Sequence, residues 1–131
     1  MQPVPFLTLV VIWLLGAAML TNPDTLESLI EEAVAKEHRL FVAIGSEDDF
    51  RGPFKRLTDN FRSVLEDKAD PTLRFLVHIG PIPPSLADRC FLHYHTLPKI
   101  KMFWRGGHLT YYGGTSPAHI RAWVAKQLRG A

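Results

Sequence analysis

The stretch LPKIKMFWRGGHLTYYGG, residues 97–114, decides which fold this chain can adopt. An alternating strand, Leu97–Trp104, is followed by a Gly106-Gly107 hairpin turn and by a second strand that ends in paired glycines. In the first strand the period of two predicts that Lys99 and Lys101 face outward and that the apolar side chains between and after them face inward. The stretch therefore predicts an antiparallel hairpin late in the chain.

Outside this hairpin the chain alternates between helical and strand patterns. The first helix begins at Asn22-Pro23, an N-cap followed by proline, and its apolar residues recur at helical spacing. Together with the hairpin, the order is α-β-α-β-α-β-β-α, which predicts an α/β fold with a mixed four-stranded sheet and helices on both faces. The other predicted elements are the strands Arg39–Gly45 and Thr72–Ile79, a helix from Pro53, a short helix at residues 83–91 and a last helix from Ser116-Pro117.

Composition and charge fit one ordinary domain. The 131 residues are 47% hydrophobic and carry a formal net charge of +2, which is enough apolar material for a core. From Arg89 to the end there are seven basic residues and no acid. This asymmetry indicates either an anionic partner or, in our preferred interpretation, acids and bases that pair across the fold. The small net charge argues against nucleic acid as a partner.

An uncharged apolar run, Val4–Leu20, precedes the first helix. Its 17 residues are short for a membrane-spanning helix, which needs about 20, and Gly16-Ala17-Ala18 offers a site for signal peptidase. Residues 1–20 are therefore predicted to be a cleaved signal peptide, and residues 21–131 the mature domain. An uncleaved signal anchor or a buried helix is the alternative. We expect a location in the secretory pathway (endoplasmic reticulum lumen or secreted) or in a bacterial periplasm, with membrane contact only through an uncleaved segment.

The chain has a single cysteine, Cys90, so it can form no intramolecular disulfide. In an oxidising compartment such a thiol is either buried or available to the thiol of a partner. The sequence leaves both possibilities open.

Histidines give only a weak indication of a metal site. His93 and His95 stand two residues apart, but a site would need a third ligand such as His78 or His108, and no pattern supplies it. We therefore expect neither a metal nor another cofactor. His38, His108 and His119 are expected to be exposed.

Two segments resemble the thioredoxin and protein disulfide isomerase family. Residues 95–128 resemble the carboxyl half of such a domain, with Pro98 at the family's cis-proline position. FRGPFKRL, residues 50–57, resembles the active-site segment Trp-Cys-Gly-Pro-Cys-Lys. The resemblance spans roughly residues 24–129 and implies the thioredoxin fold. It also places Cys90 at a core position of the short helix, which implies burial.

The chain departs from this family at the residues that carry the chemistry. Arg51 and Phe54 stand where the resemblance places the two cysteines. Dithiol exchange needs a thiolate and a second thiol that resolves the mixed disulfide, and neither a guanidinium nor a phenyl ring can act as either. Ala43 stands where the resemblance places a buried acid. We therefore expect no dithiol–disulfide oxidoreductase activity.

The resemblance also implies a surface for an extended peptide, between the helix start and the cis-proline loop. Arginine and aromatic residues are frequent at binding hot spots, so we expect a redox-inactive, chaperone-like binding module for a peptide or protein partner. Phe54 alone is better explained as the first core residue of its helix. The alternatives are a monothiol redox protein that uses Cys90 in mixed disulfides, and a membrane-anchored assembly subunit. The expected partner-binding residues are Phe50, Arg51, Gly52, Pro53, Phe54, Leu97 and Pro98.

Overall fold

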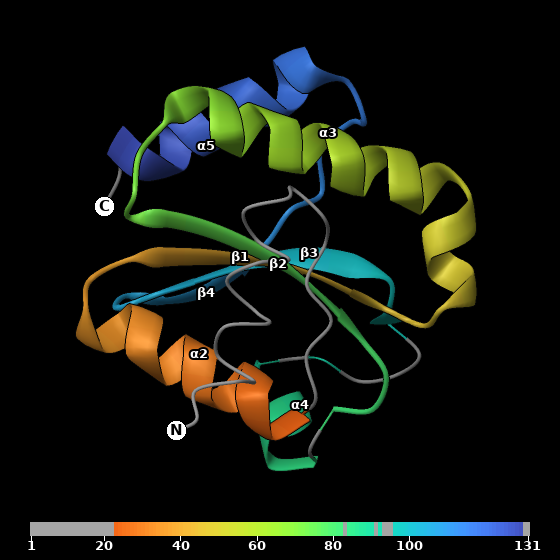
Figure 1. Ribbon diagram of the computed structural model, residues 1–131, viewed down its shortest axis with the longest axis vertical. Helices are drawn as coiled ribbons and strands as arrows, with labels where there is room; N and C mark the ends of the chain where they lie inside the picture. Colours follow the sequence, from red (N-terminus) through yellow and green to blue (C-terminus); the bar gives the residue numbers. More distant parts are fainter. Residues whose placement is uncertain (1–22, 83, 91, 93–95, 130–131) are drawn as a thin grey trace, which may run out of the picture.

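The computed structural model describes residues 23–82, 84–90, 92 and 96–129, and Figure 1 shows their arrangement. The elements begin and end close to where the sequence patterns place them. The predicted leader, residues 1–20, lies outside the described residues. The elements are α2 (Pro23–Ala35), β1 (Arg39–Gly45), a 3-10 turn η1 (Asp48–Arg51), α3 (Pro53–Lys68), β2 (Leu73–Ile79), α4 (Pro84–Cys90), β3 (Lys99–Trp104), β4 (Gly107–Thr110) and α5 (Pro117–Arg129).

The four strands form one mixed sheet with the order β2-β1-β3-β4. β1 pairs with β2 in parallel and with β3 antiparallel, and β3 and β4 form the predicted hairpin. α3 and α5 cover one face of the sheet, and α2 and α4 cover the other (Figure 1). The prediction of an α/β fold with a mixed four-stranded sheet is therefore confirmed.

The core on the α3 and α5 face is built from aromatic rings. Phe61 of α3 is fully buried, and its ring centroid lies 5.6 Å from that of Phe41 and 5.2 Å from that of Tyr111. Phe75 and Trp123 complete the group at 6.3 and 6.1 Å. These residues come from β1, α3, β2, α5 and the end of the hairpin, so one ring joins both halves of the chain.

The core on the α2 and α4 face is aliphatic. Leu26, Ile30 and Ala33 form the buried stripe of α2 that the helical spacing predicts, and they pack against the other face of β1. Cys90, the last residue of α4, belongs to the same cluster and is 6% exposed. The expectation that Cys90 occupies a core position is therefore confirmed.

Lys101 corrects the prediction of an outward-facing lysine, because only 2% of this residue is exposed. Its partner across the sheet is Val42, whose side chain lies in the aliphatic core, so the lysine faces α2 and α4 rather than solvent. The Nζ atom donates a hydrogen bond to Oγ1 of Thr110 at 3.1 Å. Burial, helped by the nearby charge of Lys99, lowers the pKa of Lys101 to about 8. The alternation of side chains along the strand was predicted correctly, but the second face of the sheet is buried as well.

Replacing Lys101 by methionine is expected to stabilise the protein at pH 7 by about 2–3 kcal/mol. The folded-state pKa of about 8 lies below the ordinary lysine value of 10.5, so the buried charge opposes folding in full at every pH below about 8. Methionine keeps an unbranched side chain without the charge, while losing the hydrogen bond to Thr110, which is worth about 1 kcal/mol. Urea unfolding at pH 7 measures the difference in the free energy of unfolding.

The pH dependence of stability, compared between wild type and Lys101→Met, tests the lowered pKa of this lysine. Between pH 8 and 10.5 the unfolded chain binds more protons at Lys101 than the folded one, so wild-type stability should rise in this window relative to the variant. Lys126→Met, at an exposed position of α5, is the control and should change little. A Lys101→Met protein that is less stable than wild type at pH 7 would contradict the expectation.

In the part of the chain that the structure describes, none of the helices combines the length and the apolar composition needed to cross a membrane.

Candidate partner-binding site

A short loop and the turn η1 connect the buried strand β1 to α3, and one carboxylate fixes their shape. Oδ2 of Asp49 accepts hydrogen bonds from the backbone N–H of Ser46 at 2.7 Å and from its hydroxyl at 3.0 Å. The N–H of Asp49 donates in return to Oγ of Ser46 at 3.3 Å. Such reciprocal bonds hold a turn without further packing. The loop that leads to Phe50 therefore has a defined course.

Phe50 and Phe54 stand on either side of the start of α3. Their ring centroids are 5.0 Å apart with the planes tilted, and both side chains are half-buried against the aromatic core. Phe50 has φ −90° and ψ 25°, outside helical geometry, which turns the chain into α3. The interpretation of Phe54 as the first core residue of its helix agrees with this packing. Its exposed part, together with Phe50, leaves apolar surface at the helix start.

Between the two rings the chain presents Arg51, Gly52 and Pro53 to solvent. The Arg51 guanidinium lies 3.4 Å from a carboxylate oxygen of Asp48, and both side chains are mostly exposed. An ion pair of this kind contributes little stability, so the guanidinium can exchange partners at small cost. A Cβ atom on Gly52 would have no atom within 4 Å, which shows open space above this residue.

The loop that carries Pro98 lies beside Gly45, at the end of β1. The Leu97–Pro98 peptide bond is cis, as the resemblance implies. Pro98 is exposed, whereas Leu97 is half-buried and packs against the aliphatic core. A Cβ on Gly45, the last residue of β1, would lie 2.9 Å from Oδ2 of Asp49 and 3.1 Å from Cβ of Pro98. Only glycine lets the two segments come this close.

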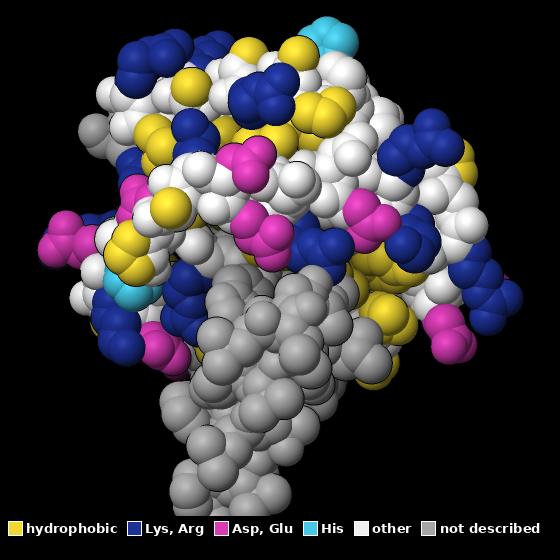
Figure 2. Space-filling model, turned by 45° about the horizontal axis from the view of Figure 1, so that its top comes forward, with side chains coloured by type: hydrophobic (Ala, Val, Ile, Leu, Met, Phe, Trp, Pro, Cys, Tyr) yellow, Lys and Arg dark blue, Asp and Glu magenta, His cyan; other side chains and the backbone are white. Residues whose placement is uncertain are grey.

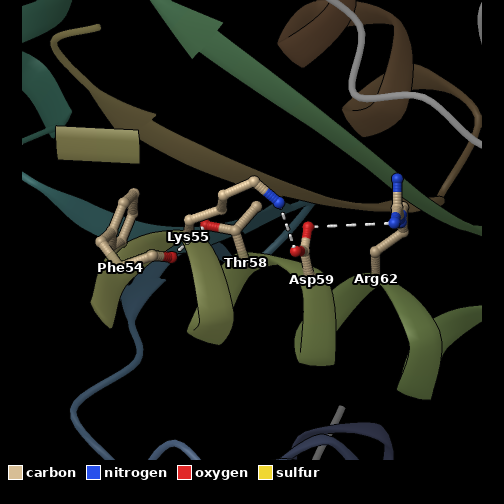
Figure 3. A network of polar contacts seen from close by, with 5 residues as sticks. All are labelled: Phe54, Lys55, Thr58, Asp59 and Arg62. Atoms are coloured by element: carbon tan, nitrogen blue, oxygen red, sulfur yellow. Dashed lines mark hydrogen bonds and ion pairs between the residues drawn. The ribbon is translucent and has the colours of Figure 1, made fainter. Parts of the chain in front are cut away.

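The first turns of α3 carry a chain of polar contacts that runs away from this surface (Figure 3). The Lys55 ammonium lies 2.7 Å from Oδ2 of Asp59, and Arg62 approaches the same carboxylate at 3.9 Å. The hydroxyl of Thr58 donates to the carbonyl oxygen of Phe54 at 2.7 Å. Lys55, which matches the family's lysine, is therefore engaged along the helix, and Arg51 is the cation at the helix start.

The predicted site residues fall into one area, except for Cys90. Phe50 to Phe54 and Pro98 surround the end of β1, while Leu97 anchors the second segment. Cys90 lies on the opposite face of the sheet, in the aliphatic core. Burial, partly offset by the charges of Arg89 and Lys101, raises the pKa of its thiol. A raised pKa keeps the thiol protonated and unreactive.

Ala43, at the position of the family's buried acid, is fully buried among apolar residues of the aromatic core. The side chain at this position therefore cannot transfer a proton. Neither a thiol nor a buried acid lies at this end of the sheet among the described residues.

Cys90 should resist alkylation in the native protein. The residue is 6% exposed and its thiol pKa is raised, so an uncharged reagent such as iodoacetamide meets little thiolate. Mass spectrometry should show less than about a tenth of the protein modified after a time that labels the protein fully in urea. Complete labelling under native conditions would contradict the expectation and revive the monothiol alternative.

The predicted exposure of the histidines is correct for one residue and wrong for two. His119 is exposed as expected, but His38 and His108 are half-buried. His78 is fully buried, and its Nε2 lies 3.0 Å from the carbonyl oxygen of Pro81, while burial lowers the pKa of the imidazole. His93 and His95 lie outside the described residues. Within those that are described, no three metal-binding side chains gather.

The basic residues after position 88 are partly paired with acids from the first half of the chain. Arg89 lies 3.2 Å from Glu27, and Arg105 lies 3.1 Å from Glu37. Figure 2 shows Lys and Arg side chains scattered over the visible face, with Asp and Glu side chains between them. These pairs support the interpretation that the charge asymmetry of the sequence is balanced across the fold.

Comparison with solved structures identifies the architecture. Chloroplastic thioredoxin z superposes with a TM-score of 0.61 at 18% identity, over 87% of this chain and 96% of that one. Spinach chloroplast thioredoxin f gives 0.59 at 15% identity, over 88% of both chains. The chain has the thioredoxin fold. Human ERp44 in its zinc-bound form gives 0.58 at 15% identity, where 84% of this chain matches 32% of that larger one. No protein-family model and no curated protein matches the sequence.

Two residues that shape the site were not among the predicted ones. Asp49 holds the turn, and Gly45 makes room for Pro98. The glycine that ends a buried strand just before a Ser-x-x-Asp sequence was a usable signal, because Ser and Asp at this spacing close turns. Its contact with Pro98 spans more than fifty residues and has no local pattern.

Proposed function

We propose that this chain is a redox-inactive thioredoxin-fold module that holds a peptide or protein partner at the end of β1. The surface consists of Phe50, Arg51, Gly52 and Pro53, together with the cis-Pro98 loop. The module acts in the secretory pathway or a bacterial periplasm, and it reaches its compartment by the apolar leader. Binding requires no cofactor and no thiol.

One observation carries the proposal: the helix start and the cis-Pro98 loop are both present, and they carry an exposed guanidinium at Arg51 and a half-buried ring at Phe54. Gly52-Pro53 begins α3, and Pro98 is cis and exposed beside Gly45. Arg51 has only a weak ion pair, and the pair of phenyl rings offers apolar area at its side. Arginine beside aromatic surface is the composition of binding hot spots.

The monothiol alternative has less support, because Cys90 lies in the aliphatic core with a raised thiol pKa. The membrane-anchored alternative uses the same binding surface and differs only in the fate of residues 1–20. Intact mass of the protein purified from its native cells separates the two, since cleavage removes the apolar run.

Photo-crosslinking in native cells tests the binding surface. A photoreactive residue replaces Arg51, and the matched control carries it at Arg121, an exposed position of α5. We expect adducts at position 51 that are absent at position 121. A discrete adduct indicates a dedicated partner, and many adducts indicate client binding of the chaperone kind. Equal labelling at both positions, or none at position 51, would overturn the proposal.

A further inference from the structure

A hollow of about 490 Å³ lies at the end of the sheet opposite the proposed partner-binding surface. β1 begins there with Arg39 and ends at the other site with Gly45. Arg39 and Trp104 are the next residues outward from the paired Leu40 and Phe103, so they are neighbours at this edge of the antiparallel pair. The lining is formed by Glu37, His38, Arg39, Trp104, Arg105, Gly106 and Leu128. The volume is in the range of small-molecule sites, about 300–1,000 Å³.

The acids near this hollow accept hydrogen bonds or form ion pairs with other residues, whereas Arg39 interacts with Asp70 only through its charge, which helps to lower the pKa of that carboxyl. Asp70 accepts hydrogen bonds from the backbone and side chain of Thr72 at 2.9 and 2.7 Å. Glu37 is paired with Arg105 at 3.1 Å. Throughout the described part of the chain, no residue forms a hydrogen bond or a close ion pair with the half-buried Arg39 side chain. A guanidinium in this state offers a planar donor set to an oxyanion.

A second polar group of the lining also lacks a partner. Nδ1 of His38 is buried and has no hydrogen-bond partner. The backbone holds this residue in place, because Glu37 adopts φ 59° at the end of α2 and the N–H of His38 donates to the carbonyl of Ala33 at 2.8 Å. A buried nitrogen without a partner costs free energy that a bound oxygen or a water molecule can recover.

The remaining wall is flat and apolar. A Cβ on Gly106 would clash with Nε1 of Trp104. The indole therefore folds back over the turn, and only glycine permits this position. Trp104 and Leu128 are both half-buried against the aromatic core, which limits their movement. Aromatic ligands stack on a fixed indole face.

We propose that this hollow binds a small organic oxyanion that carries a flat aromatic ring. The carboxylate or sulfonate group lies against Arg39 and His38, and the ring lies against Trp104 and Leu128. The site is independent of the proposed partner-binding surface, because β1 separates the two ends. It assigns a second binding capacity to the chain, for a ligand of the aromatic acid class.

The probe is 8-anilinonaphthalene-1-sulfonate, with the uncharged N-phenyl-1-naphthylamine as its matched control. We expect saturable binding of one sulfonate per folded protein, with amide NMR signals of Arg39, Trp104 and Gly106 shifting together. Arg39→Gln should lower the affinity for the sulfonate by about 10-fold to 100-fold, since a hydrogen bond to a charged group contributes about 1.5–3 kcal/mol. The same change should leave the uncharged probe unaffected. Gly106→Ala should weaken both probes by displacing the indole.

Arg121→Gln is the matched protein control and should bind the sulfonate like wild type. Several results would overturn the proposal: no saturable binding, equal affinity in Arg39→Gln, or shifts that cluster at residues 50–54 and 97–98. Binding that appears only after removal of Gly130 and Ala131 would also overturn it, because those residues would then be the occupant. None of these results bears on crosslinking at Arg51, so the two proposals fail separately.

Discussion

Phe61→Ala is expected to lower the free energy of unfolding by about 3–5 kcal/mol, the largest effect of any single substitution considered. Phe61 is fully buried, and its ring has four aromatic neighbours with centroids 5.2–6.3 Å away. Truncation removes the transfer free energy of the ring and leaves a cavity whose rigid aromatic walls cannot collapse. The four ring pairs, which contribute beyond buried area, place this loss in the upper part of that range.

Urea unfolding followed by circular dichroism measures this loss. Tyr112→Ala is the control, because that ring is 87% exposed and its removal should change stability by less than about 0.5 kcal/mol. Domains of this size have about 5–15 kcal/mol of total stability, so the alanine variant can fall below the level needed to fold. Phe61→Leu, which retains most of the volume, then reports the same site at a smaller cost. A loss below about 1.5 kcal/mol for alanine would show that the cluster repacks.

The residues of this core could be predicted from the sequence, because the spacing of apolar residues in a helix or strand is a local pattern. The spacing of Leu57, Phe61 and Val64 is enough to define the inner face of α3. Lys101 shows where the period fails: alternation separates two faces of a strand but does not say whether both are covered. α2 and α4 cover the second face, so the lysine became a buried cation with a lowered pKa.

In the candidate site too, the sequence predicts local features but not contacts between distant segments. The exposed Arg51-Gly52-Pro53 turn follows from the family resemblance and from proline at a helix start. The approach of Pro98 to Gly45 depends on which strands become neighbours. The same holds for the position of Arg39 beside Trp104 at the far end of the sheet. Pairing across the sheet has no local pattern, so sequence reasoning placed His38 in solvent and did not single out Arg39.

The double substitution Arg51→Cys and Phe54→Cys is expected to give the protein dithiol activity, with the wild type expected to stay at background. The two cysteines would flank Gly52-Pro53 at the start of α3, with the cis-Pro98 loop alongside. The N-terminal end of α3 favours the thiolate at position 51, and the thiol at position 54 resolves the mixed disulfide. Insulin reduction with dithiothreitol as the reductant should rise from background to a measurable rate.

The single substitutions separate the two roles of these thiols. Arg51→Cys alone should form mixed disulfides that persist, because the resolving thiol is missing, and Phe54→Cys alone should do neither. The double variant should remain slower than a thioredoxin, since Ala43 supplies no acid for proton transfer. A double variant that forms its disulfide but reduces no insulin would contradict the expectation, because the helix start and the cis-Pro98 loop would then not be sufficient for exchange with a peptide substrate.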